Sequence, residues 1–264
     1  MRTLPLAITL LLVPAAAAAQ APPQATAQSS ISFEMLHPSL DGDDGVSVLS
    51  GAYFVAGRIA LRPDLALIAE LPVGYFRQSS AISGIGSESS STIGNPLIGL
   101  ALNRGTVELG FAARAPLAAD DELAWLYAAL TDPYRMEAFT PDIASLQATA
   151  RMQRPAGAAT MWGIDLGSVL FVPTDGGEVE LALDYGGAIG YPGQLVRATL
   201  RLNGRAFVTG GGDLGAMTEH QAGLFADFGS GRLRPGIQLR VPLDEGTRDA
   251  LKATFGVSLQ YLLP

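Results

Sequence analysis

Apolar and polar residues alternate along several long segments of the chain. From Val107 to Ala115 the odd positions are apolar, whereas the even positions include Glu108 and Arg114. The same two-residue period recurs in three further segments, 178–190, 231–243 and 248–262. Because successive side chains of a strand point to opposite faces, each segment predicts a β-strand with one apolar and one polar face.

The length of these segments separates two kinds of β-protein. Soluble sandwiches also alternate, but their strands are usually about 5 to 6 residues long, whereas tilted membrane strands need about 9 to 11. The predicted runs extend over about 10 to 14 residues and carry several ionised groups on their polar face, which suits a water-filled lumen. The pattern therefore favours an all-β fold, a closed antiparallel transmembrane β-barrel.

Turn signals between the runs divide the barrel domain, residues 31–264, into about twelve strands, an even number as in closed bacterial barrels. The predicted strands are 31–37, 46–61, 64–76, 93–103, 106–116, 141–153, 159–172, 178–190, 194–208, 217–228, 231–243 and 248–262. Tight turns and longer loops alternate between them, which places both chain ends on the periplasmic side. Because the first strand has the weakest pattern, about ten strands remain the alternative.

The longest connection, residues 117–140, has a different pattern. Asp120, Asp121 and Glu122 precede apolar residues with a helical period, and Pro133 follows them. This pattern predicts a short helix in an outer loop, with acidic residues at its start and the proline at its end. Two interpretations stay open: the helix forms a lid or constriction over or inside the lumen, or the loop packs on the barrel rim. The candidate lid residues are Leu123, Trp125, Leu126 and Tyr127.

The chain begins with a segment typical of secreted proteins. Met1 and Arg2 give a positive start, an apolar run follows, and small residues end in an Ala-x-Ala site at Ala19. Residues 1–19 are therefore predicted to be a signal peptide, and residues 20–30, rich in Pro, Gln and Ser, a flexible leader. The apolar run is too short for a spanning helix. A secreted barrel belongs in the bacterial outer membrane, with membrane lipid and the outer-membrane assembly machinery as partners.

Composition and charge exclude several classes of function. A net charge of −8 and an isoelectric point near 4.7 argue against nucleic acid as a partner, because a basic face would be needed to bind it. The chain has no Cys, and hence neither disulfides nor thiolate ligands. The acidic run 41–45 lacks the later Glu that an EF-hand calcium site requires, so we expect no metal ion. We expect no other cofactor either.

Few residues are suited to catalysis. Of the two histidines, His37 precedes a proline at a strand end, and His220 falls on an apolar strand phase near an outer loop. We predict a surface side chain for the first and an interfacial side chain for the second. No Gly-x-x-His-x-Ser segment, as found in outer-membrane phospholipases, occurs in the chain, so we expect no enzymatic activity. If the purified protein released fatty acid from phospholipid and lost this activity on His220→Ala, the hypothesis of a lipid-modifying barrel enzyme would be supported.

The polar phase of the strands carries charges of both signs, which we expect to line the lumen and set its selectivity. The candidates are Glu70, Glu108, Arg114, Arg151, Asp165, Glu180, Asp184, Arg197, Arg201, Arg205, Asp227, Arg234 and Arg240. Tight turns at Pro192-Gly193 and Ser230-Gly231 would bring polar side chains opposite one another. The facing pairs predicted from these turns are Asp184 with Arg201, Glu180 with Arg205, Asp227 with Arg234, and Gln221 with Arg240.

The segment 91–100, Ser-Thr-Ile-Gly-Asn-Pro-Leu-Ile-Gly-Leu, resembles the strand after the second outer loop in a family of bacterial outer-membrane barrels. These are transporters of the phenol-degradation meta-pathway type, related to hydrophobic-compound channels that include the fatty-acid transporter. The resemblance implies passive diffusion of small solutes, with hydrophobic and aromatic compounds as candidates. Two features depart from the pattern: the Asn-Pro-Ala plug signature of the fatty-acid channels is absent, and the chain ends at Pro264 instead of an aromatic residue.

We therefore expect an outer-membrane channel or transporter that lets small solutes diffuse passively. Its lumen of about twelve strands would lie between the filled interior of about eight strands and the open pore of about sixteen. The alternative is a non-conducting structural or adhesive barrel, whose lumen the same ion pairs would block. Planar-bilayer conductance separates the two, because only the channel would show steady openings.

Overall fold

The computed structural model describes residues 28–40, 46–80, 88–120, 123–157, 159–209 and 218–264. The predicted signal peptide, 1–19, and nearly all of the predicted leader, 20–30, lie outside these residues and stay predictions. The acidic run 41–45 lies outside them as well. Ser30 already belongs to the first strand, one residue before the predicted start of the barrel.

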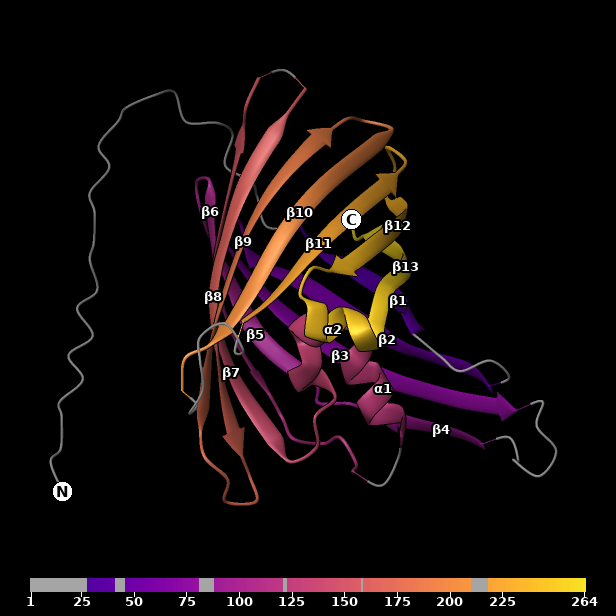
Figure 1. Ribbon diagram of the computed structural model, residues 1–264. Helices are drawn as coiled ribbons and strands as arrows, with labels where there is room; N and C mark the ends of the chain where they lie inside the picture. The colour runs from indigo at the N-terminus through magenta and orange to yellow at the C-terminus, as the bar shows by residue number, and fades with distance from the viewer. Residues whose placement is uncertain (1–27, 41–45, 81–87, 121–122, 158, 210–217) are drawn as a thin grey trace, which may run out of the picture.

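The strands pair antiparallel in one sheet (Figure 1). They are β1 (Ser30–Leu40), β2 (Val46–Arg62), β3 (Leu65–Ser80), β4 (Glu88–Ile93), β5 (Leu97–Arg104), β6 (Val107–Arg114), β7 (Ile143–Pro155), β8 (Met161–Pro173), β9 (Glu180–Pro192), β10 (Val196–Phe207), β11 (Thr218–Phe228), β12 (Leu233–Pro242) and β13 (Leu251–Leu262). β1 pairs with both β2 and β13, and β2 pairs with β3, so the sheet closes on itself. β4 and β5 both pair with β3 and form one spanning strand that is interrupted at 94–96. The thirteen segments thus make a closed antiparallel barrel of twelve strands, which confirms the predicted fold.

Within the described residues, three short helices belong to the longer connections at one end of the barrel (Figure 1). α1 (Leu123–Thr131) and the 3₁₀ helix η1 (Pro133–Ala138) lie in the predicted loop 117–140, and α2 (Glu245–Ala250) joins β12 to β13. The predicted acidic start of the helix includes residues 121–122, which lie outside the described residues. No helix in the described part of the chain is long and apolar enough to cross a membrane.

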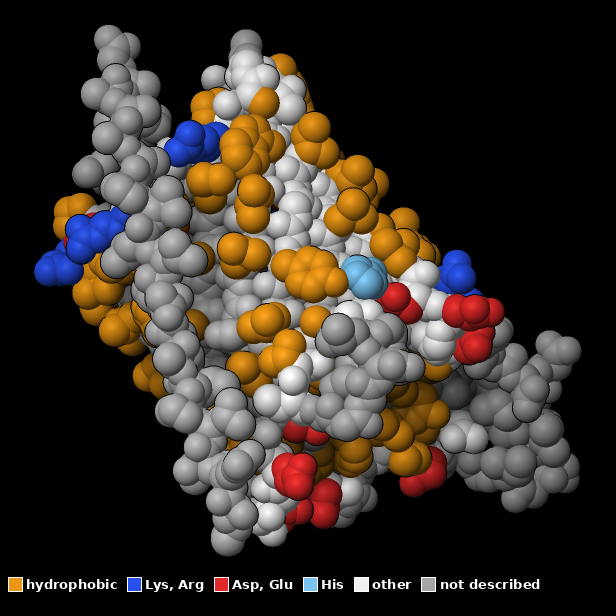
Figure 2. All heavy atoms as spheres, turned by 60° about the vertical axis from the view of Figure 1, so that its left-hand side comes forward, with side chains coloured by type: hydrophobic (Ala, Val, Ile, Leu, Met, Phe, Trp, Pro, Cys, Tyr) orange, Lys and Arg blue, Asp and Glu red, His pale blue; other side chains and the backbone are white. Residues whose placement is uncertain are grey.

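The two faces of the strands differ as the alternation predicts. Large apolar side chains such as Phe33, Leu166 and Leu200 are exposed on the outer surface of the barrel. In Figure 2, apolar side chains cover the middle of the visible face, and charged side chains lie toward its edges. Polar side chains of the other phase point inward, where Arg205 and Arg240 are buried. A barrel surrounded by hydrocarbon requires this arrangement.

The predicted register of the β9–β10 hairpin is wrong. Arg205 lies opposite Asp184 instead of Glu180. Arg201 lies opposite Ala188 instead of Asp184. The reason is that β9 continues through the proline of the predicted turn, so the turn forms further along the chain. Because the pairing moves by an even number of residues, the charges keep their inward face.

The next hairpin, β11–β12, differs from the prediction in the same way. Its facing pairs include Asp227 with Gly236 and Gly223 with Arg240, in place of Asp227 with Arg234 and Gln221 with Arg240. The shift is again even, so inward residues stay inward.

Residues 77–92, which separate the predicted strands 64–76 and 93–103, are partly a hairpin instead of the loop expected between them. β3 continues to Ser80, β4 starts at Glu88, and Arg77 faces Ser89 across the pair. Serine-rich composition indicates a loop when considered alone, but pairing with an adjacent long strand outweighs that preference. Residues 81–87, between the two strands, are not described.

Candidate functional site in the barrel lumen

The connection between β6 and β7 folds into the barrel. Its helix α1 packs its alanine face on the inner wall, where Ala124 and Ala128 are fully buried. A Cβ atom at Gly74 of β3 would lie 2.9 Å from the carbonyl oxygen of Ala124 and 3.0 Å from the Cβ of Ala128. Small residues on both sides therefore let the helix lie directly against the strand.

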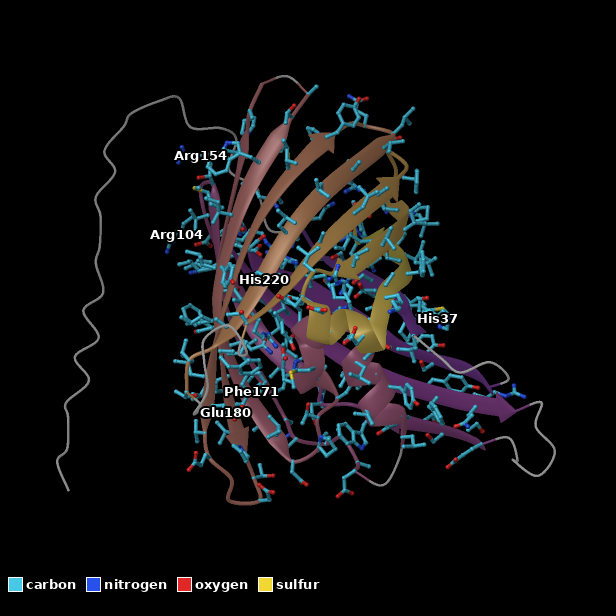
Figure 3. All side chains as sticks on the ribbon, in the orientation of Figure 1. His37, Arg104, Arg154, Phe171, Glu180 and His220 are labelled. Atoms are coloured by element: carbon cyan, nitrogen blue, oxygen red, sulfur yellow. The ribbon has the colours of Figure 1, made fainter. Side chains whose placement is uncertain are left out.

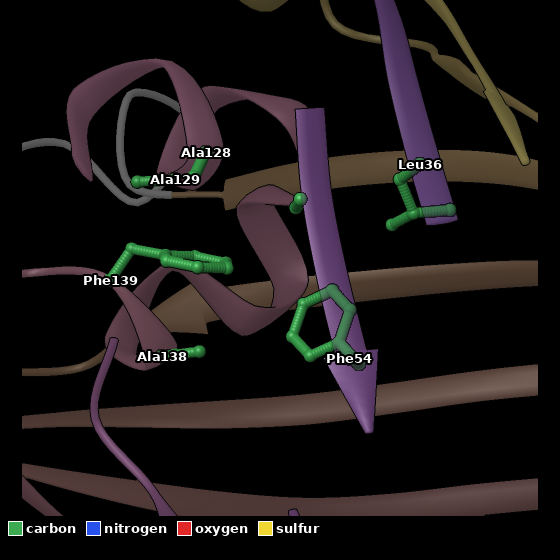
Figure 4. Packing of buried hydrophobic residues seen from close by; sticks show 7 residues of the cluster. Leu36, Phe54, Ala128, Ala129, Ala138 and Phe139 are labelled. Carbon is green, nitrogen blue, oxygen red and sulfur yellow. The ribbon is translucent and has the colours of Figure 1, made fainter. Parts of the chain in front are cut away.

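An apolar cluster holds the end of this connection. Figure 4 shows Ala138 and Phe139 beside Leu36 and Phe54, which point inward from β1 and β2. The rings of Phe54 and Phe139 meet edge to face, with 5.5 Å between their centroids. The guanidinium carbon of Arg135 lies 3.5 Å from the centroid of the Phe54 ring, close enough for a cation–π contact. The cluster is a small core inside the lumen.

Asn95, in the interruption between β4 and β5, connects the wall to both ends of the inward connection. Its side-chain nitrogen donates to three backbone carbonyl oxygens near the end of the connection, those of Glu137 at 3.0 Å, Thr140 at 2.7 Å and Ile143 at 3.3 Å. Its side-chain oxygen accepts from two backbone N–H groups near the start, those of Leu117 at 2.7 Å and Ala118 at 2.8 Å. Neighbouring Gly94 permits this close approach, because a Cβ there would lie 2.2 Å from the carbonyl oxygen of Ala138. One buried side chain thus organises the connection from its first residues to its last.

Ion pairs hold η1 to the wall formed by β12, β1 and β3. Arg135 donates to Glu34 and Asp132 at 2.6 Å each and to Glu70 at 3.3 Å. Arg240 donates to Glu34 and Asp132 at 2.7 Å each. Burial alone would raise the pKa of Asp132, but Arg240 and Arg135 outweigh it and lower that pKa to about 2. Asp132 is therefore ionised at neutral pH.

Further bonds join η1 to β9, β10 and β11, on the side of the barrel that lies opposite β3. Arg205 of β10 donates to Asp184 of β9 at 2.7 Å and to Glu137 of η1 at 3.1 Å. The hydroxyl of Tyr134 donates to the backbone oxygens of Asn203 and Glu219 at 2.9 and 2.6 Å. Because η1 is bonded to both walls, it crosses the lumen and obstructs a straight path through it.

A cavity of about 350 Å³ lies beside η1, in the half of the lumen nearer the short turns. Tyr134, Arg135 and Glu137 line one side of it, and Arg58 and Arg114 lie on the strands around it. Among the residues described, no group of three or more His, Asp or Glu side chains could hold a metal ion. The site can obstruct, filter and bind polar groups, but the described residues offer no metal centre.

The whole architecture matches solved barrels. The crystal structure of the COG4313 outer membrane channel from Pseudomonas putida F1 superposes with a TM-score of 0.58 and 11% identity, over 95% of this chain and 100% of that one. The chain therefore has the fold of bacterial outer-membrane β-barrels. No protein-family profile matches it, and no curated protein matches it by sequence.

Two other solved barrels resemble this one at similar distance. The translocator domain of the autotransporter NalP from Neisseria meningitidis gives a TM-score of 0.56 at 12% identity, over 89% of this chain and 88% of that chain. The KdgM porin in complex with disordered oligogalacturonate gives 0.50 at 9% identity, over 89% and 99%. Because channels and a translocator share the architecture, these likenesses establish the fold alone.

Most of the predicted lumen residues lie in ion pairs. The pairs are Glu70 with Arg114, Glu108 with Arg58, Arg151 and Arg201 with Asp165, Asp184 with Arg205, Arg197 with Asp227, and Arg240 with Glu34 and Asp132. Two predicted residues lie elsewhere. Glu180 is exposed at the start of β9, near the looped end of the barrel (Figure 3), and Arg234 donates to the carbonyl oxygen of Gly231 in a turn. Their role in selectivity stays a prediction.

The candidate lid residues lie on α1, but the leucines do not pack on the wall. Leu123 and Leu126 are 42% and 39% exposed. Tyr127 stacks on Phe76 with 4.5 Å between ring centroids, and Trp125 is half-buried. The helix faces the wall with alanines because only small side chains fit there. Whether these residues act as a lid stays a prediction.

Sequence patterns did not identify several residues of the lumen. Five of them hold the connection: Glu34, Asn95, Asp132, Arg135 and Glu137. Two others bond within the wall: Arg58 donates to Glu108, and Gln238 donates to Glu34. Glu34 and Arg58 are on the inward phase of their strands, so alternation alone could have found them. Asp132 directly precedes Pro133, and Arg135 and Glu137 follow it; charges beside a proline in a loop are usually solvated.

Replacing Arg205 should destabilise the barrel strongly. Arg205→Ala leaves Glu137 and Asp184 without their shared cation, a loss of about 3 to 5 kcal/mol for a buried pair. Arg197→Ala is the matched control. Arg197 lies 3.9 Å from its partner Asp227, and both side chains are partly exposed, so this ion pair should contribute less than about 1 kcal/mol. Urea unfolding in lipid vesicles, followed by heat-modifiable gel mobility, measures both. Equal losses for the two variants would contradict the structural role of Arg205.

Proposed function

We propose that this barrel is a passive outer-membrane channel whose resting state is closed by η1. The observation that carries the proposal is that η1 crosses a polar lumen while bonded to both walls by Arg135 and Glu137. A loop that fills the lumen without being part of the barrel wall can leave it while the wall stays intact. The likeness to an outer membrane channel and to a porin supports this function.

The solutes that we propose are small, with hydrophobic and aromatic compounds as candidates. The cavity beside η1 is lined by Ile68, Leu97 and Val169 as well as by charged side chains. The cations that surround it are paired with carboxylates, so we expect weak ion selectivity. A narrow path with mixed lining suits uncharged or zwitterionic molecules.

A chimera without the obstruction tests the channel. Residues 123–139 are replaced by a Gly-Ser linker of the same length, which keeps the connection between β6 and β7 but removes the contacts of α1 and η1. We expect the native protein to conduct little in planar bilayers and the chimera to show steady openings at least about tenfold larger. If the chimera folds, as shown by heat-modifiable mobility, and stays silent, the channel proposal fails.

The second candidate is a non-conducting structural or adhesive barrel. It is favoured by the density of ion pairs between η1 and the wall, among them Arg135 with Glu34 and Arg205 with Glu137. Such a barrel would be silent in both forms, and a binding partner would be lost when outer loops are exchanged. The same bilayer measurement therefore separates the two functions.

We propose no catalytic step for this chain. His220 forms hydrogen bonds with Tyr185 and Asp244 on the outer surface of the barrel, and none of the serines in the described residues bonds to this group. We expect no release of fatty acid from phospholipid vesicles by either the native protein or His220→Ala. Release that depends on His220 would overturn this part of the proposal.

The closed state should resist moderate acid. Asp132 has a pKa of about 2 in the folded protein, below its ordinary value of about 3.9. Ionised Asp132 stabilises the closed state. This contribution is complete at a pH above the ordinary pKa of the carboxyl group, and it is lost as the pH falls through about 2. Conductance should therefore stay constant from about pH 7 to about pH 4 and rise only below about pH 3. In Asp132→Asn, which cannot titrate there, the rise should be smaller; an acid opening already complete near about pH 5 would contradict this role.

A further inference from the structure

The outer surface of the barrel carries a groove of about 710 Å³ across strands β8 to β11. Two outward positions in it are glycines. Gly187 of β9 faces Leu202 of β10, and Tyr185 of β9 faces Gly204 of β10. Because neither glycine has a side chain, the outer surface is recessed at these two positions relative to the neighbouring side chains.

Apolar side chains form the sides of the groove. Ile164 and Leu166 rise from β8, and Leu200 and Leu202 rise from β10; all four are exposed on the apolar belt of the barrel. Hydrocarbon surrounds this belt in the membrane, so the groove will be filled by an apolar chain and not by water. Its volume is within the range of sites that enclose a ligand.

The groove ends at a polar group on the side of the longer loops. The ring of Tyr185 lies over Gly204, where a Cβ atom would be 2.3 Å from it. The Tyr185 hydroxyl is 2.8 Å from Nε2 of His220, and Nδ1 of His220 is 3.0 Å from Oδ1 of Asp244. The backbone N–H of His220 donates to the other oxygen of Asp244. In Figure 2 a histidine lies where the apolar side chains meet acidic ones, and Figure 3 labels His220.

Asp244 presents a negative charge at this end. Burial by itself would raise the pKa of Asp244, but the side-chain and backbone hydrogen bonds from His220 outweigh it and lower that pKa. The carboxylate is about one-third exposed, so another donor can reach it. An ammonium group fits this position, whereas a headgroup with only a phosphate would be repelled.

We propose that the groove binds one acyl chain of a glycerophospholipid whose headgroup carries an ammonium, and that this ammonium pairs with Asp244. The chain would lie over Gly187 between the leucines of β8 and β10, and the headgroup would reach the loop that contains Asp244. The site is on the outer face of the wall, so it does not depend on conduction through the lumen.

Native mass spectrometry tests the chain site. The purified full-length protein is incubated with equal amounts of phosphatidylethanolamine and phosphatidylglycerol that have the same acyl chains. In Gly187→Leu the Cβ has room, because the nearest atom to it is 4.0 Å away, and the rest of the side chain would extend into the groove. The control is Gly57→Leu on β2, where nothing lies within 4 Å and whose partner Ile31 is exposed. We expect one retained phosphatidylethanolamine in the native protein and in the control, and about tenfold less in Gly187→Leu.

Asp244→Asn tests the headgroup in the same mixture. The native protein should retain phosphatidylethanolamine about three- to fivefold better than phosphatidylglycerol, the preference that an exposed ion pair gives. Asp244→Asn should retain the two lipids equally. Equal retention by native protein and Gly187→Leu overturns the groove, and equal retention of the two lipids by the native protein overturns the ammonium pair. A dimer that Gly187→Leu dissociates would show that a second copy of the chain, and not lipid, covers the groove.

Discussion

Arg135→Ala should convert the closed barrel into an open one. Arg135 is the shared cation of Glu34, Glu70 and Asp132, and its removal leaves these carboxylates close together with only part of their compensation. Loss of one partner from a buried ion pair costs about 3 to 5 kcal/mol. That energy is lost only in the closed state, so it shifts the ratio of closed to open forms by about two orders of magnitude or more. Planar-bilayer recordings should show frequent openings where the native protein shows few.

Arg151→Ala is the control for this variant. Arg151 is also an inward arginine in an ion pair, but its partner Asp165 belongs to the wall and not to η1. Its replacement changes the lumenal charge by the same amount and leaves the obstruction in place. If the two variants conduct alike, the effect comes from charge in the lumen and the gating role of Arg135 is wrong.

Asn95→Ala should release the same connection without changing any charge. The side chain of Asn95 is fully buried and bonds to both ends of the connection. Alanine leaves three carbonyl oxygens and two N–H groups without this partner, at about 1 to 3 kcal/mol for each group that water cannot reach. We expect protease cleavage within residues 117–140 to become at least about tenfold faster and conductance to rise with it.

Asn103→Ala is the matched control, because Asn103 lies at the other end of β5 beside a short turn. It should leave cleavage and conductance at native levels. Rapid cleavage of Asn95→Ala together with native conductance would show that the connection can loosen without opening the lumen. In that case the structural barrel would be the better interpretation.

The barrel could be predicted from the sequence because alternation records which face of each strand meets hydrocarbon. The register could not be predicted to the residue, since an even shift leaves every side chain on the same face. Arg205 illustrates this: its inward direction follows from alternation, but its partner Asp184 depends on where the β9–β10 turn forms. Turn signals such as Pro192-Gly193 are compatible with more than one centre.

The inward connection was harder to predict. Leucines spaced along a helix usually indicate the packed face, yet here α1 packs through Ala124 and Ala128. The reason is the close approach to Gly74 on a distant strand, and a single sequence does not show which elements meet. Asn95 bonds to backbone groups, which have no sequence signature, so only the three-dimensional structure shows its role.

The charges of η1 and its preceding residue have a consequence for how the barrel responds to an electric field. Asp132, Arg135 and Glu137 together carry a net charge of only one. A potential of about 100 mV can do at most about 2.3 kcal/mol of work on one charge, even if that charge crosses the entire membrane. This is less than the cost of breaking one of the buried ion pairs. For the proposed channel we therefore expect a barrier that is insensitive to voltage and that opens in response to a chemical signal or an incoming solute.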